Sequence, residues 1–191
     1  MSRQLITHME KFIKLSTEHQ QVLINYVKRE SYKKKEIILS SGDVCRSTYF
    51  VVKGCLRMYF ITEKGLEQTT QFALENWWIS DYMAFTSQTA CGFYIQAVES
   101  TEVVVLDHYA LERLYQEIPA TERYFRMIYQ KMAAAAQQRT KYFQDFSKEE
   151  IYIHFSKSFP EFIQRVPQYL IASYLGFTPE YLSEIRKKNL S

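Results

Sequence analysis

The chain has 191 residues, of which 47% are hydrophobic, so it can form one large domain or two small ones around a sizeable core. Its net charge of +3 is too low to indicate nucleic-acid binding by overall charge, so any DNA-binding charge must be local. Three scattered cysteines exclude a disulfide framework, and no run of about 18 apolar residues predicts a membrane span. We therefore expect a reducing, cytoplasmic protein that is neither secreted nor membrane-spanning.

The first part of the chain changes from helical to strand-like periodicity. Residues 2–28 are predicted to form two short helices, separated at Ser16-Thr17. After residue 31, short runs rich in β-branched and aromatic residues alternate with glycine-containing turns, which favours a small antiparallel barrel or roll. Barrels of this kind can hold one small ligand. The predicted strands are 32–39, 48–52, 55–62, 68–74, 93–98 and 102–106, around an irregular middle.

Downstream of residue 107 the periodicity is helical again. A short helix over 108–117 is followed by Pro119 and by a long helix over 121–146, whose apolar residues step by three and four. This heptad-like seam suits pairing with a second copy of the helix, although the same face can also pack on the chain's own barrel. Ser147 and Glu150 then predict a capping box that opens another helix. The predicted dimer residues are Phe125, Ile128, Met132, Ala135 and Tyr142, and Arg139 interrupts their seam.

The segment that begins at Gln168 has the spacing of a helix-turn-helix. Counted from Gln168, a small residue (Ala172) is fifth, a glycine (Gly176) is ninth and an apolar residue (Leu182) is fifteenth. The small residue allows a second helix to cross closely, and the glycine supplies the positive φ of a tight turn. The apolar residue anchors the second helix on the first. An ordinary helical hairpin is the alternative interpretation of this spacing.

The second helix of this segment has its own start signals and a surface for a partner. Thr178 is the predicted N-cap, Pro179 the first helical residue, and Glu180 adds a negative charge to the first turn. With Leu182 and Ile185 pointing inward, the opposite side is available for the major groove of double-stranded DNA. The predicted DNA-contacting residues are Gln168, Thr178, Pro179, Glu180, Tyr181, Ser183, Glu184, Arg186, Lys187 and Lys188.

Three segments resemble the Crp/Fnr family of bacterial transcription regulators: YFVVKGCLR over 49–57, AVESTEV over 97–103 and TPEYLSEIRKK over 178–188. The resemblance covers nearly the whole chain. It implies an α+β fold with an antiparallel, cyclic-nucleotide-binding-like β-roll (a double-stranded β-helix), a long dimerisation helix and a C-terminal helix-turn-helix. The implied boundaries are 1–118, 119–146 and 147–191. It also implies a homodimer that binds DNA, with RNA polymerase as a candidate further partner.

The chain departs from the family's cyclic-nucleotide binders. Ser80-Asp81-Tyr82 stands in place of the Gly-Glu-Leu that binds the ribose, and Cys91-Gly92 falls where the phosphate-binding arginine is expected. Without that cation a buried phosphate loses a charge-assisted bond of about 2–5 kcal/mol, so we expect no tight cyclic-nucleotide binding. These five residues are the predicted effector pocket, for an unidentified small molecule. The aromatic residues of the roll can also fill the barrel completely, which would leave no pocket.

Other cofactors and enzymatic activity are not expected. No cysteine precedes Cys45, whereas the family's iron–sulfur members use an N-terminal cysteine group. The four histidines are isolated and predict neither a haem nor a metal site. Cys91 is a candidate thiol sensor, although a small buried hydrophobe is the favoured interpretation. There is no Gly-rich phosphate loop, no catalytic triad and no histidine–carboxylate cluster of the kind that a cupin-type oxygenase needs.

The resemblance also bears on specificity. In the family the glutamate at the position of Glu180 contacts bases, whereas Pro179 and Glu184 replace the arginines that read guanine, so a different operator is expected. Winged members add a strand pair after the recognition helix, and this chain is expected to lack it. The predicted function is a dimeric, sequence-specific transcription regulator. The alternative is a sensory or protein-interaction module with a degenerate helix-turn-helix.

Overall fold

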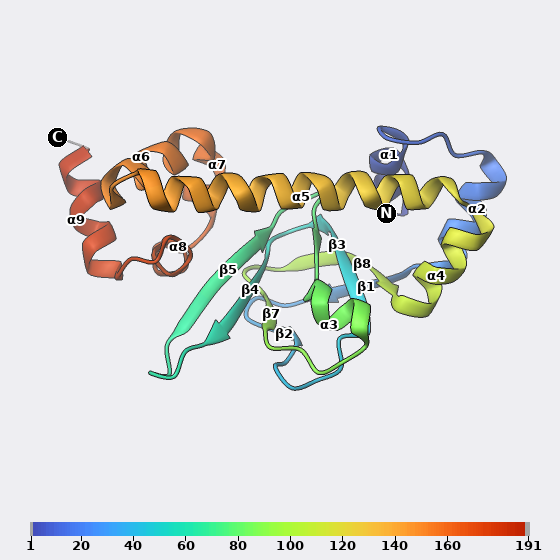
Figure 1. Cartoon of the computed structure of the whole chain (residues 1–191), viewed down its shortest axis with the longest axis horizontal. Helices are drawn as coiled ribbons and strands as arrows, with labels where there is room; N and C mark the ends of the chain where they lie inside the picture. The colour runs from blue at the N-terminus through green and yellow to red at the C-terminus, as the bar shows by residue number, and fades with distance from the viewer. Residues whose placement is uncertain (1, 190–191) are drawn as a thin grey trace. The chain divides into compact units, whose positions relative to one another are not determined.

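The computed structural model describes residues 2–189 and divides into two compact units. Unit 1 comprises the chain up to residue 60 together with 70–129, and unit 2 comprises 61–69 together with the chain from 130 onward. Strand β5 (Glu67–Ala73) and helix α5 (Ala120–Asp145) each run from one unit into the other. Figure 1 traces the chain through these elements.

Unit 1 is built around a β-roll. Its strands are β1 (Lys28–Tyr32), β2 (Ile37–Leu39), β3 (Ser47–Lys53), β4 (Leu56–Ile61), β6 (Trp78–Ile79), β7 (Tyr94–Ala97) and β8 (Thr101–Asp107). Together with β5 they form two four-stranded sheets within the described residues, in the orders β1-β8-β3-β6 and β2-β7-β4-β5. Strand β8 pairs antiparallel with both β1 and β3, and its apolar residues 103–106 are buried. The predicted α+β fold with an antiparallel roll is confirmed.

The turn between β3 and β4 requires glycine. Gly54 has φ +106°, and a Cβ placed there would lie 2.7 Å from Thr101 Cα and 2.8 Å from Ser100 O. The Gly54 amide donates to Glu75 Oε1 at 2.8 Å, and the next amide, of Cys55, donates to Thr101 Oγ1 at 3.2 Å. The turn is therefore pressed against the start of β8 by backbone as well as side-chain contacts.

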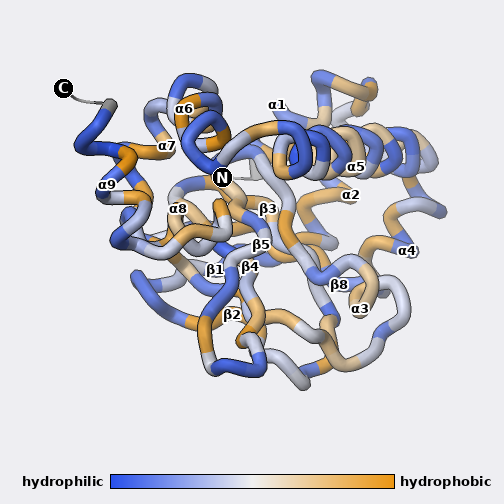
Figure 2. Tube along the Cα trace, turned by 60° about the vertical axis from the view of Figure 1, so that its left-hand side comes forward, coloured by the Kyte–Doolittle hydropathy of each residue, from blue (hydrophilic) through white to orange (hydrophobic). Residues whose placement is uncertain are grey.

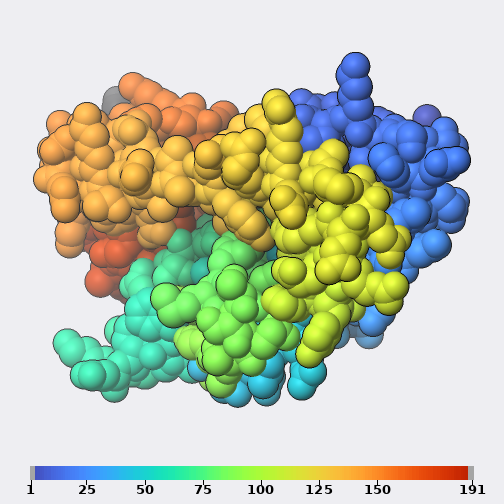
Figure 3. Space-filling model, turned by 45° about the vertical axis from the view of Figure 1, so that its right-hand side comes forward, coloured from blue at the N-terminus to red at the C-terminus, as the bar shows by residue number. Residues whose placement is uncertain are grey.

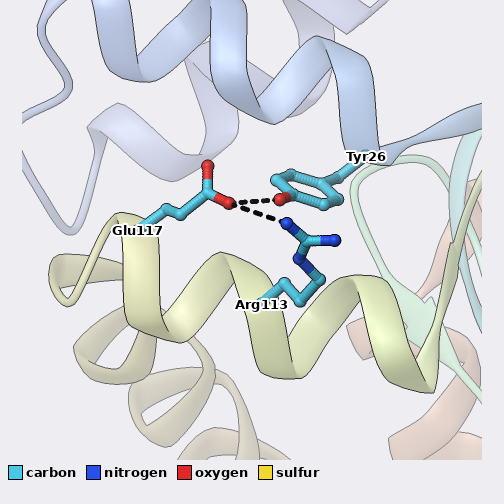
Figure 4. A network of polar contacts seen from close by, with 3 residues as sticks. All are labelled: Tyr26, Arg113 and Glu117. Atoms are coloured by element: carbon cyan, nitrogen blue, oxygen red, sulfur yellow. Dashed lines mark hydrogen bonds and ion pairs between the residues drawn. The ribbon is translucent and has the colours of Figure 1, made fainter.

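Unit 1 also contains helices that flank the roll. They are α1 (Ser2–Glu10), α2 (Thr17–Tyr26), α3 (Tyr82–Ser87), α4 (His108–Glu117) and the first half of α5. Tyr124 of α5 is fully buried, and its hydroxyl accepts from Trp78 Nε1 and bonds with His8 Nδ1, each at 2.8 Å. Figure 4 shows how α2 is joined to α4: Tyr26 donates to the Glu117 carboxylate, which also pairs with Arg113 at 3.8 Å.

The sequence missed some short elements of unit 1. The predicted strand 32–39 is divided by a turn at which Lys35 has φ +70°, and β1 lies before it. The five residues of β1, KRESY, are mostly exposed and polar, so their strand state depends on pairing with β8. The irregular middle contains β6 and α3, and both are too short to show a periodicity of their own.

Unit 2 contains the C-terminal helices: α6 (Lys148–Ser158), α7 (Pro160–Arg165), α8 (Gln168–Leu175) and α9 (Pro179–Asn189). The predicted capping box opens α6, with the Ser147 side chain accepting from the Glu150 amide and the Glu150 carboxylate accepting from the Ser147 amide. Arg139 Nη2 donates to Tyr174 O at 2.8 Å, and its guanidinium lies 4.1 Å from the Tyr174 ring centroid. The residue that interrupts the predicted seam of α5 therefore ties this helix to α8.

Candidate nucleic-acid interface and effector region

The turn between α8 and α9 has the predicted geometry. Gly176 has φ +72° and ends α8 in the left-handed conformation, and the Phe177 amide then donates to Ala172 O at 2.8 Å. Ala172 is completely buried, as expected of the small residue where two helices approach. The local sequence therefore fixes where the first helix stops and where the second begins.

Helix α9 begins at its predicted cap and has one buried side. Thr178 Oγ1 accepts from the Tyr181 amide at 3.2 Å, and Pro179 is the first helical residue. Leu182 and Ile185 are buried, with 1% and 3% of their surfaces exposed. Figure 2 shows hydrophobic and hydrophilic residues alternating along the helix. The anchoring role predicted for Leu182 and Ile185 is thus seen in the structure.

The opposite side of α9 is open to solvent and carries most of the predicted DNA-contacting residues. Its first half presents two exposed carboxylates, Glu180 and Glu184, and its last turn carries three cations. This order suits the helix macrodipole, because acids are favoured at the N-terminus and bases at the C-terminus. Exposed residues of the set are Gln168, Thr178, Pro179, Glu180, Tyr181, Glu184, Lys187 and Lys188, and Ser183 and Arg186 are half-buried.

One cation beside this surface was missed by the sequence analysis. Lys148, the exposed first residue of α6, has its Nζ 5.5 Å from the ring centroid of Tyr181 and 6.0 Å from that of Phe177. The contact joins residues far apart in the chain, so no local pattern could have indicated it. The first turn of α9 thus has a lysine from another helix as its neighbour.

The predicted dimer residues of α5 differ in their environment. Phe125 and Ile128 are buried within unit 1, where Phe125 packs on Trp78 and Tyr124 with ring centroids 5.2 and 5.0 Å away. They are therefore core residues, in line with the alternative that part of this face packs on the chain's own barrel. Met132 is half-buried and Ala135 is exposed, and half-buried Tyr142 stacks on Phe146.

The exposed surface in the second half of α5 is formed by small apolar side chains followed by polar ones. Residues 133–136, a run of four alanines, are exposed, and so are residues 137, 138 and 140. Figure 3 shows this helix, coloured yellow to orange, at the surface of the molecule. The uncovered surface of this half of α5 therefore includes Ala135 of the predicted seam.

In the effector region, the structure brings Asp81 and Gly92 together. Asp81 is buried, with 7% of its surface exposed, and caps α3 by accepting from the Ala84 amide through Oδ1 at 3.2 Å. Its Oδ2 accepts from the Gly92 amide, also at 3.2 Å. Both carboxylate oxygens thus hold backbone amides of this chain, and so the carboxylate has a structural role in joining α3 to the segment before β7.

The other residues of the predicted pocket also have partners within unit 1. Ser80 Oγ donates to Ser47 O at 2.9 Å, and the buried Cys91 thiol donates to Ser40 O at 3.0 Å. Burial raises the pKa of the Cys91 thiol, which lowers its thiolate fraction and its reactivity. The Tyr82 ring packs edge-on against Tyr129 at 5.3 Å. Burial raises the pKa of Tyr82 as well.

We expect Asp81→Asn to lower the free energy of unfolding by about 1–3 kcal/mol, because an amide can accept only one of the two backbone bonds that the carboxylate accepts. Asp43→Asn, at an exposed position, is the matched control and should change stability by less than about 0.5 kcal/mol. Urea unfolding followed by circular dichroism measures both. Equal stabilities of the two variants would contradict the structural role of Asp81.

The part of the chain that the structure describes contains neither a metal-binding cluster nor a membrane-spanning helix. Among residues 2–189, no group of three or more His, Cys, Asp and Glu side chains is placed so that it could hold a metal ion. Within the same residues, no helix combines the length and the apolar character that crossing a membrane requires.

Comparisons with known proteins agree with this architecture. Residues 29–118 match the cyclic nucleotide-binding domain family. The chain is 25% identical over 182 residues to Regulatory protein HlyX of Actinobacillus pleuropneumoniae, covering 88% of this chain and 75% of that protein. FixK2 of Bradyrhizobium japonicum superposes with a TM-score of 0.70 at 19% identity, over 85% of this chain and 83% of FixK2. The c-di-GMP-responsive regulator CLP of Xanthomonas campestris gives 0.74 at 12% identity, over 92% of each chain. These structural matches show the fold.

Proposed function

We propose that this chain is a Crp/Fnr-type transcription regulator that binds double-stranded DNA as a homodimer, and the match of residues 29–118 to the cyclic nucleotide-binding domain family supports this. The observation that carries the proposal is helix α9, whose Leu182 and Ile185 are buried while its charged side is exposed. HlyX is named a regulatory protein, which supports a regulatory and not an enzymatic role.

In this proposal α9 lies in the major groove. Glu180, exposed in its first turn, can accept a hydrogen bond from a cytosine N4 amine. Arg186, Lys187 and Lys188 follow at the other end and supply charge for backbone phosphates, which dominate affinity but carry no sequence information. Base choice and affinity are therefore assigned to different ends of the same helix.

The homodimer is proposed to form through the second half of α5. Its exposed alanines, 133–136, allow a second helix to approach closely, whereas Phe125 and Ile128 are already committed to the core of unit 1. A two-fold dimer would place two copies of α9 in half-sites about 34 Å apart, one turn of DNA. RNA polymerase is a further proposed partner, which a regulator bound beside a promoter would contact.

The proposed effector is a small molecule other than a tightly bound cyclic nucleotide. The Asp81 oxygens already accept backbone bonds, and Cys91 and Gly92 supply no cation for a phosphate. Isothermal titration with cyclic AMP and cyclic GMP should give no micromolar binding. A micromolar dissociation constant for either nucleotide would refute this part of the proposal.

A mobility-shift experiment separates the regulator from the alternative, a sensory or protein-interaction module. The full chain is titrated into DNA from upstream of its own gene at about 50 and 200 mM salt. A DNA-binding protein that neutralises several phosphates should shift the fragment and lose affinity steeply at the higher salt. If neither salt concentration gives a shifted band, the interaction module is the better explanation.

Two substitutions in α9 are expected to have different signatures. Glu180→Ala should relax the preference at one base position by about 1–3 kcal/mol, because it removes a base-edge acceptor. Lys187→Ala should weaken binding to every sequence and reduce the salt slope by about 1, because it removes a phosphate contact. Competition assays with single-base variants of the operator distinguish the two. Identical specificity profiles for both variants would contradict the division of roles along α9.

A further inference from the structure

The amino end of α9 has a positively charged neighbour from another helix. The Lys148 ammonium lies over the ring of Tyr181, and Tyr181 and Phe177 meet edge to face with centroids 5.7 Å apart. Phe177 is buried and Tyr181 has 37% of its surface exposed, so the inner ring is fixed and the outer ring faces solvent. The lysine ammonium is thus held against these two aromatic rings, beside the start of α9.

The first half of α9 itself carries only negative charge, which is unfavourable beside a DNA backbone. Residues 179–185, PEYLSEI, contain two carboxylates and no cation, and both carboxylates are exposed. The cations of α9 begin only at Arg186, more than one helical turn beyond Glu180. A DNA backbone that passes the first half of α9 would therefore meet net negative charge from this helix alone.

Lys148 is placed to offset those carboxylates. Glu150, two residues further along the same helical turn, is turned back onto Ser147, with its Oε2 2.8 Å from the amide and 2.7 Å from Oγ. In a cation–π contact the face of the aromatic ring attracts the ammonium without being a hydrogen-bond acceptor for all of its N–H groups, so Lys148 can still donate to phosphate oxygens. The lysine is exposed, as such a contact requires.

We propose that Lys148, held over the Tyr181 ring, binds a backbone phosphate of DNA at the amino end of α9. This inference rests on the proposed DNA-binding function and extends the interface to α6. Lys148 would give one end of the interface the phosphate contact that residues 186–188 give to the other end. Because the contact is to the backbone, it fixes the position of α9 and does not select bases.

The test is a salt titration of DNA affinity with the full-length protein, using a fluorescent duplex from upstream of its own gene. Lys148→Gln should lower affinity about eightfold at ~0.1 M salt and reduce the slope of log K against log salt by about 0.9, equally for all sequences. Lys148→Arg keeps the charge and should retain the wild-type slope. Lys157→Gln, an exposed lysine near the other end of α6, is the matched control and should leave both quantities unchanged.

The outcomes separate this inference from the function on which it rests. If Lys148→Gln keeps the wild-type affinity and slope while Lys187→Ala lowers both, the protein binds DNA but Lys148 takes no part. If the wild-type protein shows no salt-dependent DNA binding, both ideas fail together. Thermal melting of Lys148→Gln should match that of Lys148→Arg, which shows that a lost contact and not a lost fold explains the weaker binding.

Discussion

Replacing Gly54 by alanine is expected to lower the free energy of unfolding of the roll by about 3–5 kcal/mol. The new Cβ would lie 2.5 Å from Thr101 Oγ1, 2.7 Å from Thr101 Cα and 2.8 Å from Ser100 O, so backbone atoms of a neighbouring segment would have to move. The residue would also be strained by its φ of +106°. Denaturant unfolding followed by circular dichroism measures the loss.

Gly42→Ala is the matched control for this change. Gly42 also has positive φ, +95°, but a Cβ there would meet nothing within 4 Å. It should therefore cost only the backbone strain, about 1–3 kcal/mol. The difference between the two variants isolates the collision at the β3–β4 turn. Equal losses would mean that the turn does not lie as close to Thr101 as the structure shows.

Replacing Leu182 by alanine is expected to destabilise unit 2 by about 2–5 kcal/mol, because only 1% of the side-chain surface is exposed and its loss leaves a cavity. The same change should abolish DNA binding in the mobility-shift assay, because α9 would no longer be held in one orientation. Scanning calorimetry of the full chain would show a transition at lower temperature for the part that contains α8 and α9.

Ser183→Ala is the control at the neighbouring position, which is half-buried and does not anchor the helix. It should change stability by less than about 0.5 kcal/mol. A Leu182→Ala protein that binds DNA with wild-type affinity would show that α9 does not need its anchor, and the proposed interface would then have to lie elsewhere.

Much of the C-terminal helical organisation could be predicted because its signals are local. Gly176 ends α8 through a positive φ, Thr178 caps α9, and Ser147 and Glu150 form the capping box of α6. Each of these devices works within a few residues of the chain, so the sequence alone is sufficient to indicate it. The same holds for the burial of Leu182 and Ile185, which follows from helical spacing once the helix start is known.

Elements that depend on distant partners were harder to predict. The polar strand β1 is a strand because it pairs with β8, and nothing in KRESY itself favours that state. The seam of α5 was correctly seen as apolar, but apolar spacing does not say what covers it. Phe125 and Ile128 are covered by unit 1 of the same chain, whereas Ala135 of the same seam is exposed together with the other residues of 133–136.

The candidate sites, too, could be predicted from the sequence only in part. The sequence identified Asp81 and Gly92 as members of one region, and the structure joins them by a hydrogen bond, but as a structural contact of the chain itself. It could not identify Lys148, because the lysine meets Tyr181 only after α6 and α9 have folded together. Contacts between segments far apart in the chain require the structure.

Whether paired copies of α9 read DNA can be decided by selecting binding sites from random duplexes with the full-length protein. We expect enrichment of a two-fold symmetric sequence whose half-sites are about 10 base pairs apart, and loss of that enrichment with Leu182→Ala. A pool that stays random after selection with folded protein, or an enriched site that Leu182→Ala still binds, would contradict it.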